Sequence, residues 1–187
     1  MKRKVSPGTK GFWSDVHEYE VTLSVGLLLR DILQENGATV IMTRTTNDVD
    51  ISNVERAILF NEAQTDYALR IHCNGAQDQT KEGASILIPK TNPYKEDCRL
   101  AAEILLADFC AETGMLLRGI VERGDQSGFN WCERMIINIE MGYMSNRKDD
   151  AYLSDSDNHK TMAQGLANGI IRYFEEAEKR MISTPAP

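Results

Sequence analysis

The stretch DYALRIHCNG, residues 66–75, is an apolar run that ends in a histidine, a cysteine and an asparagine before a glycine. A short apolar run of this kind predicts a β-strand, with His72 at its end. Four more runs have strand character: ATVIMTR at 38–44, ASILIP at 84–89, LRGIVERG at 117–124 and MIINIE at 135–140.

Segments with a helical spacing of apolar residues alternate with these strands. They span 14–37, 51–64, 96–114 and 159–179. Ser14 or Asp15 is predicted to cap the first helix, and Ser52 and Glu55 have the spacing of a capping box at the start of the second. Strands that alternate with helices of ten or more residues indicate an α/β fold, in which helices cover both faces of a layered sheet.

Length and composition favour one compact domain. The 187 residues, 42% of them hydrophobic, suffice for one substantial core and not for two. We expect this domain to fill 1–187, with a core at 8–176 and flexible ends at 1–7 and 177–187. The cysteines lie far apart without a Cys-x-x-Cys pair, so free and mostly buried thiols are expected at Cys73, Cys98, Cys110 and Cys132.

The charge and the apolar pattern exclude two classes of partner. A net charge of -7 and a pI near 5 give no general attraction for phosphate backbones or anionic lipid, so no nucleic-acid partner is expected. No apolar stretch approaches the roughly 18 to 20 residues of a membrane span. The basic start MKRKVSPGTKG lacks the apolar segment of an export signal, although a mature part of an exported protein would look the same.

Three ionisable residues are expected at one edge of the predicted sheet. In open α/β sheets, ligands bind beyond the carboxyl ends of the strands. His72 and Glu140 each end a predicted strand, and Glu18 lies in the first turn of the first helix. Each also has a structural alternative. His72 fits a hydrogen-bonded loop residue, Glu18 has capping-box spacing from Asp15, and Glu140 fits an acceptor for the backbone of 142–146.

Taken together, the three residues favour a metal site. One imidazole and two carboxylates are the donors expected of a catalytic zinc site that keeps a position open for water. His159, at the start of the last predicted helix, is expected to lie on the surface. His17 remains a candidate because it is adjacent to Glu18.

Several segments resemble, in order and spacing, the zinc-dependent N-acetylmuramoyl-L-alanine amidases of the Amidase_3 family. The resemblance covers roughly 8–174, and its most specific marks are the glutamate of the first helix, an IH-x-N segment and an E-x-G-x-x-SN segment. The resembling segments are EYEVTLSVGLLLRDILQENGATVIMTRTT (18–46), SNVERAILFNEAQTDYALRIHCNG (52–75), EGASILI (82–88), RGIV (118–121), INIEMGYMSNRKDDAYL (137–153) and QGLANGI (164–170).

The resemblance implies a three-layer sandwich with a mostly parallel mixed sheet and a peptidoglycan hydrolase activity. The bond cut would be the amide between the lactyl group of muramic acid and L-alanine, in a parent protein that is secreted or associated with the cell wall. Zn²⁺ is the implied cofactor, with Glu18 and His72 as ligands, and it would polarise the amide carbonyl and activate a water. Glu140 matches the catalytic glutamate, expected to take a proton from the water and pass it to the leaving amine.

One mark of the family is missing. Its first element is an apolar strand ending in Gly-His, and that histidine is the remaining zinc ligand. Here MKRKVSPGTKG has one strand-like residue, Val5. Either SPGT is a changed version with Thr9 in place of the histidine or, as we expect, the strand is absent from this chain. A sheet without that strand has an open edge through which a homodimer could form.

Other functions remain open from the sequence. A metal-deficient relative would bind peptidoglycan or muropeptides without cutting them, and a third possibility is zinc hydrolysis of another small amide or ester. The loop at 124–134 is expected to border the cleft, where Phe129 and Trp131 either contact substrate or cover the core. Arg44 and Arg56 are expected to be structural and to pair with nearby carboxylates.

Overall fold

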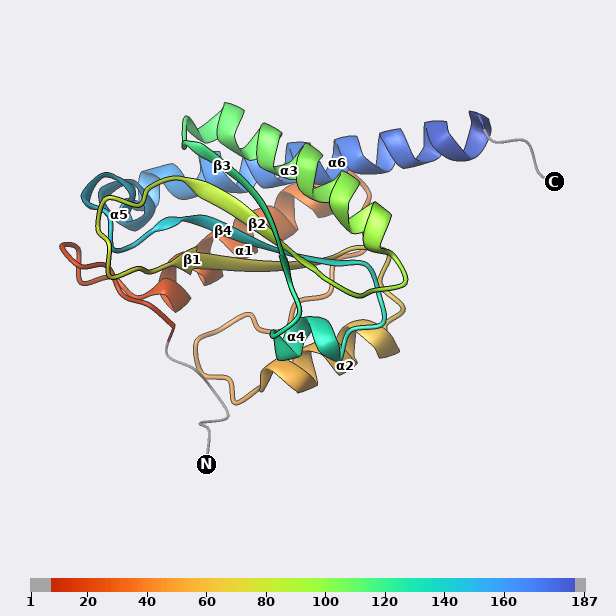
Figure 1. Cartoon of the computed structure of the whole chain (residues 1–187), viewed down its shortest axis with the longest axis horizontal. Helices are drawn as coiled ribbons and strands as arrows, with labels where there is room; N and C mark the ends of the chain where they lie inside the picture. The colour runs from red at the N-terminus through yellow and green to blue at the C-terminus, as the bar shows by residue number, and fades with distance from the viewer. Residues whose placement is uncertain (1–7, 184–187) are drawn as a thin grey trace.

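The computed structural model describes residues 8–183, which form one four-stranded sheet with helices on both sides (Figure 1). The order across the sheet is β1-β4-β2-β3. β1 runs parallel to β4 and β2 parallel to β3, whereas β2 and β4 are antiparallel. The predicted α/β class with a mixed sheet is confirmed. The strands are β1 (Ala68–Asn74), β2 (Ala84–Pro89), β3 (Leu117–Arg123) and β4 (Ile136–Tyr143).

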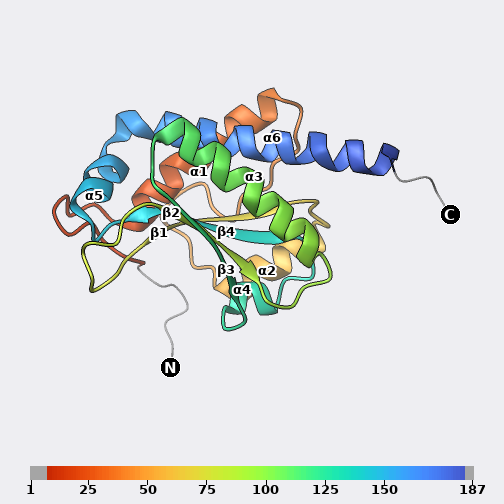
Figure 2. The same cartoon turned by 45° about the horizontal axis from the view of Figure 1, so that its top comes forward.

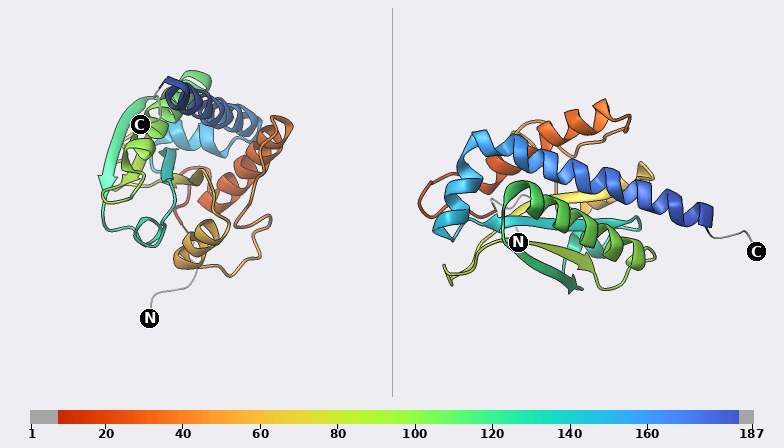
Figure 3. Two further views of the ribbon diagram at one scale, coloured as in Figure 1. Left: turned by 90° about the vertical axis from the view of Figure 1, so that its right-hand side faces the viewer. Right: turned by 90° about the horizontal axis from the view of Figure 1, so that it is seen from above.

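Two groups of helices cover the two faces of the sheet (Figures 1 and 3). The long helices on one face are α1 (Glu18–Glu35), α3 (Lys95–Thr113) and α6 (His159–Ser183). Figure 2 shows α3 and α6 side by side above the strands. The short helices on the other face are α2 (Asn53–Glu62) and α4 (Ser127–Asn130). Between β4 and α6 lie α5 (Arg147–Ser154) and the 3-10 helix η1 (Ser156–Asn158).

The main hydrophobic core lies between the sheet and the three long helices. Val21 and Val25 of α1, Phe109 of α3 and Leu166 of α6 are all fully buried there. Burial of each such side chain contributes roughly 1.5–3 kcal/mol to folding. A smaller cluster lies on the other face, under α2 and α4, and consists of Ala57, Phe60, Ala68, Leu87, Phe129, Cys132 and Ile136.

The ends of α2 and α3 follow their predicted sequence signals. The hydroxyl of Ser52 accepts a hydrogen bond from the Glu55 N–H (3.2 Å), and the Glu55 carboxylate accepts one from the Ser52 N–H (2.7 Å). α3 ends at Gly114, whose φ of 69° is a left-handed conformation that glycine adopts without strain. Both boundaries are therefore set by local chemistry.

The start of α1 differs from the prediction. The helix begins after His17, and the Glu20 carboxylate accepts a hydrogen bond from the His17 N–H (2.9 Å). Ser14 does not cap the helix, because its hydroxyl donates to the carboxylate of Asp150 (2.6 Å). Asp15 has a φ of 64°, which places it in a turn before the helix. The loop that precedes α1 is thus held by tertiary contacts that the local sequence does not reveal.

The segment 38–44 is not a strand, contrary to the prediction. It lies across a cavity of about 1260 Å³ from β1, and the two line its walls together with α1. A β-branched run forms a strand only when a neighbouring strand supplies hydrogen-bonding partners. Within residues 8–183 no strand precedes α1 or pairs with the outer edge of β1.

The remaining features concern the chain ends, the thiols and the membrane. α6 continues to Ser183, past the predicted end of the core at 176, and the predicted flexible segment 1–7 lies outside the described residues, as does 184–187. The thiols are free, and all but Cys110 are buried. In the described range, no helix is both long and apolar enough to cross a bilayer.

The packing of α6 on α3 gives a prediction about Gly169. A Cβ at this position would lie 2.6 Å from the Cα of Leu105, so Gly169→Ala forces the two helices apart. We expect the substitution to lower the free energy of unfolding by about 1–3 kcal/mol, as measured by urea denaturation.

Gly26→Ala on α1 is the matched control for this substitution. Its Cβ would meet the Cε of Met42 at 3.6 Å and the Cδ1 of Ile71 at 3.9 Å, both ordinary contacts. The gain in helix propensity should then raise the free energy of unfolding by up to about 1 kcal/mol. Equal effects of the two substitutions would contradict the close approach of α3 and α6.

Candidate functional site

Glu18 is the first residue of α1, and three hydrogen bonds hold its carboxylate. Oε1 accepts from Nδ1 of His72 (2.7 Å) and from the backbone N–H of Cys73 (3.2 Å). Oε2 accepts from the backbone N–H of Thr9 (2.7 Å). The residue is 8% exposed. Glu18 therefore joins α1 to the end of β1, and the capping-box alternative is wrong.

β1 and β4 place His72 and Glu140 side by side. The two residues are partners in the parallel register, so their side chains leave the same face of the sheet. The register shifts between His72 and Asn74, which redirects the backbone at the end of β1. Oε1 of Glu140 accepts a hydrogen bond from Nδ2 of Asn138 (3.2 Å). The structure thus brings together all three residues that the sequence singled out.

The two carboxyl groups have pKa values displaced in opposite directions. Burial raises the pKa of Glu18, but the hydrogen bonds from His72, Thr9 and Cys73 outweigh it and leave that pKa below its usual range. Burial also raises the pKa of Glu140, and the charge of Glu18 adds to this effect. The nearby His72 and the Asn138 amide oppose the rise without cancelling it. Two carboxyls tuned apart in this way are typical of acid and base roles at one site.

The donor atoms fit part of a zinc site. Nδ1 of His72 and Oε1 of Glu18 lie 2.7 Å apart, and both are zinc donors by type. Thr9 lies beside them, since its carbonyl accepts from the Glu18 N–H (3.0 Å). Within residues 8–183, no third His, Cys, Asp or Glu completes a group able to hold a metal ion. Glu18 and His72 are therefore two neighbouring groups of zinc-ligand type, and the described residues contain no complete metal site.

The other histidines do not join this pair. His17 precedes α1 and stacks on the ring of Tyr19, with ring centroids 5.0 Å apart. His159 was predicted to be a surface residue, but it is 7% exposed. Its Nδ1 bonds the hydroxyl of Ser24 (2.7 Å) and its Nε2 the carbonyl of Leu153 (3.0 Å), so it ties α6 to α1 and α5.

Buried carboxylates on α5 anchor the loops that surround the site. Oδ2 of Asp150 accepts from the backbone N–H groups of Trp13 (2.8 Å) and Ser14 (3.0 Å). Oδ2 of Asp149 accepts from the N–H groups of Gly83 (2.6 Å) and Tyr143 (2.9 Å). α5 was not predicted, although Asn146 caps it: its side chain accepts hydrogen bonds from the backbone N–H groups of Lys148 and Asp149. These contacts fix the loops after β1 and before α1.

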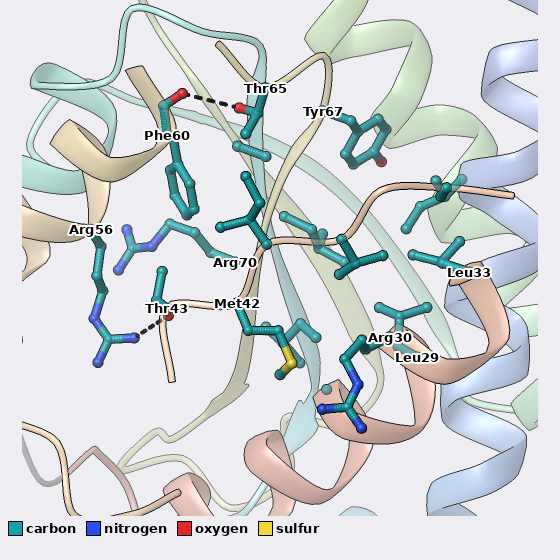
Figure 4. Close-up of a pocket in the computed structure, with 18 of the residues that line it drawn as sticks. Leu29, Arg30, Leu33, Met42, Thr43, Arg56, Phe60, Thr65, Tyr67 and Arg70 are labelled. Carbon is teal, nitrogen blue, oxygen red and sulfur yellow. Dashed lines mark hydrogen bonds between the residues drawn. The ribbon is translucent and has the colours of Figure 1, made fainter. Parts of the chain in front are cut away.

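The cavity beside β1 reaches the site, because Glu18 and His72 are among its lining residues. Figure 4 shows Arg56 and Arg70 next to one another in its wall. Arg44 also lines it. The expected pairing of Arg44 and Arg56 with carboxylates is wrong: Arg44 donates to the carbonyl of Tyr19 (2.7 Å) and Arg56 to the hydroxyl of Thr43 (3.1 Å).

The loop at 124–134 serves the core. Phe129 is 2% exposed and belongs to the smaller cluster, at the amino ends of β1 and β4 rather than at their carboxyl ends. Trp131 is 57% exposed, and its carbonyl accepts a hydrogen bond from Asn61 (2.9 Å). The structure thus favours the core alternative for Phe129 and places this loop at the opposite end of β1 from His72.

Sequence reasoning missed two polar neighbours of the site. Arg70 precedes His72 by two residues, and Asn138 precedes Glu140 by two. Arg70 therefore lies on the same sheet face as His72, and Asn138 on the same face as Glu140. Arg70 and Asn138 are also register partners. The period of two along each strand was the signal that could have identified them.

Comparison with known proteins gives a consistent assignment. The family model described as N-acetylmuramoyl-L-alanine amidase matches residues 3–172. The germination-specific N-acetylmuramoyl-L-alanine amidase of Bacillus subtilis is 27% identical over 177 residues, which cover 85% of this chain and 71% of that protein. The probable cell wall amidase LytH of Staphylococcus aureus is 26% identical over 157 residues, covering 84% of this chain. The matched part covers 50% of the length of LytH.

Solved structures share the fold. Ami1, an N-acetylmuramyl-L-alanine amidase from Mycobacterium smegmatis, superposes with a TM-score of 0.85 at 21% identity, over 92% of this chain and 83% of that one. The CwlD amidase from Clostridioides difficile, solved in complex with the GerS lipoprotein, superposes with a TM-score of 0.84 at 20% identity, over 92% and 93%. The family match spans most of the sequence, and the chain therefore belongs to the N-acetylmuramoyl-L-alanine amidase family.

Proposed function

We propose that this chain hydrolyses the amide bond between N-acetylmuramic acid and L-alanine in peptidoglycan, with Glu18 and His72 as metal ligands and Glu140 as the catalytic acid and base. The observation that carries the proposal is the direct hydrogen bond between Glu18 and His72 beside the partly buried Glu140. Family membership supports the reaction class, and the names of the relatives support an action at the cell wall.

Glu140 is suited to proton transfer. Burial raises its pKa, which brings the carboxyl nearer to the pH at which it can both accept and donate a proton. In the proposed reaction it takes a proton from the attacking water and passes it to the amine of L-alanine as the amide bond breaks. The hydrogen bond from Asn138 orients the carboxyl. Glu18, with its lowered pKa, stays ionised throughout.

Zinc is the proposed cofactor. When bound, it supplies Lewis-acid polarisation of the substrate carbonyl and acidifies water. Glu18 and His72 would hold it through Oε1 and Nδ1, after release of the proton that Nδ1 now donates to Glu18.

A second candidate function is a metal-deficient relative that binds peptidoglycan without cutting it. The incomplete donor set among the described residues favours this alternative. The pairing of Glu18 with His72 next to Glu140 favours the enzyme, because a protein that only binds peptidoglycan has no need of these three groups at one place.

Glu140→Gln is expected to reduce amidase activity by about 10²–10⁴-fold, because the amide cannot transfer a proton. Release of L-alanine-bearing peptides from purified peptidoglycan with added zinc measures the effect. Glu103→Gln, an exposed change on α3, is the control and should retain full activity. Full activity of the Glu140→Gln variant would refute the role of Glu140, and the variant should remain folded because a neutral side chain of the same shape is readily buried.

Glu18→Gln and His72→Gln are each expected to weaken zinc binding by more than about tenfold, because each removes a donor. Competition with a coloured chelator measures the affinity, and thermal melts check folding. His17→Gln should leave the affinity unchanged. If His17→Gln weakens binding as much as His72→Gln does, the ligand assignment is wrong.

Homodimer formation through the outer edge of β1 remains a prediction. The edge faces the cavity and pairs with no strand in the described range. Sedimentation over a range of protein concentrations is expected to show dimers in equilibrium with monomers. A monomer at all concentrations, with an intact sheet, would contradict this assembly.

A further inference from the structure

Three arginine side chains converge on one part of the cavity beside β1. Arg44 ends the segment 38–44, which faces β1, Arg56 belongs to α2, and Arg70 belongs to β1. All three line the same cavity, and the positive charge of Arg56 lowers the pKa of Arg44 and of Arg70. Figure 4 shows Arg56 and Arg70 together in the cavity wall.

The hydrogen-bond partners of these arginines are neutral. Arg44 donates to the Tyr19 carbonyl and to the side chains of Thr22 and Asn47. Arg56 has the Thr43 hydroxyl (3.1 Å) and Arg70 the Asn53 side chain (3.2 Å).

No ion pair joins any of the three to a carboxylate of residues 8–183. The charges of Glu18 and Glu140 attract them only at longer range, Glu18 acting on Arg44 and Arg70 and Glu140 acting on Arg70.

This arrangement is costly without an anion. Partly buried cations lose part of their hydration. The neutral oxygens that accept from these guanidinium groups form weaker hydrogen bonds than a carboxylate would. Burial accordingly lowers the pKa of Arg44 and of Arg56. Because the chain as a whole carries a net charge of -7, the cluster is a local reversal of sign, which a bound anion would neutralise.

We propose that Arg44, Arg56 and Arg70 form a subsite for the free carboxylate groups of the stem peptide. The inference rests on the proposed function, which brings a peptide to this site. The cavity that holds the arginines also contains Glu18 and His72 in its wall, so a peptide bound there lies next to the proposed scissile bond. N-acetylated sugars carry no charge to match three guanidinium groups, whereas the stem peptide does.

The test compares two probes by isothermal titration calorimetry on the full chain. One is the free stem peptide, with its carboxylates ionised, and the other is the same peptide with those carboxylates amidated. We expect the wild type to bind the free form at least tenfold more tightly. Arg56→Gln should remove at least tenfold of that affinity without changing binding of the amidated form, and Arg56→Lys should lose less because it keeps the charge.

Arg30→Gln is the matched control. Arg30 lines the same cavity, but its guanidinium is already paired with Asp31 (2.7 Å), so its removal should leave both affinities unchanged. Equal wild-type binding of the two peptides, or an equal loss in Arg30→Gln and Arg56→Gln, would overturn the subsite. Binding is measured without turnover, so a chain that selects the free peptide but releases none from peptidoglycan contradicts the proposed function and supports the subsite.

Discussion

The hydrogen bond between Glu18 and His72 is the interaction on which the geometry of the site depends. It joins the first residue of α1 to the carboxyl end of β1, and these two elements are far apart in the sequence. The same carboxylate also accepts the N–H groups of Thr9 and Cys73, so the loop before α1 and the end of β1 are fixed by one buried group. Removing a carboxylate from this position would leave buried donors unsatisfied, at about 1–3 kcal/mol each.

That constraint also separates the chemistry of the two glutamates. Glu18 receives hydrogen bonds that stabilise its charged form, whereas Glu140, one strand away, receives one long hydrogen bond from Asn138. Burial then raises the pKa of Glu140, and His72, the Asn138 amide and Arg70 oppose the rise only in part. The difference arises from the number of N–H groups that point at each carboxylate, and both residues occupy the same small region of the sheet.

Much of the fold follows from the sequence because its signals are local. The four paired strands and the capping box of Ser52 and Glu55 needed only residue spacing. The strand ends indicated His72 and Glu140, and the first turn of the first helix indicated Glu18. What escaped depends on distant partners. The run at 38–44 has strand composition but no neighbour to pair with, and His159 is buried because Ser24 and Leu153 complete its hydrogen bonds.

The open edge of β1 and the incomplete donor set occur at one place. β1 runs toward His72, its outer edge faces the cavity, and the cavity wall includes both Gly8 and Glu18. The outer edge of β1, which pairs with no strand in the described range, therefore leads directly to the Glu18–His72 pair and to Thr9, whose backbone N–H donates to Glu18.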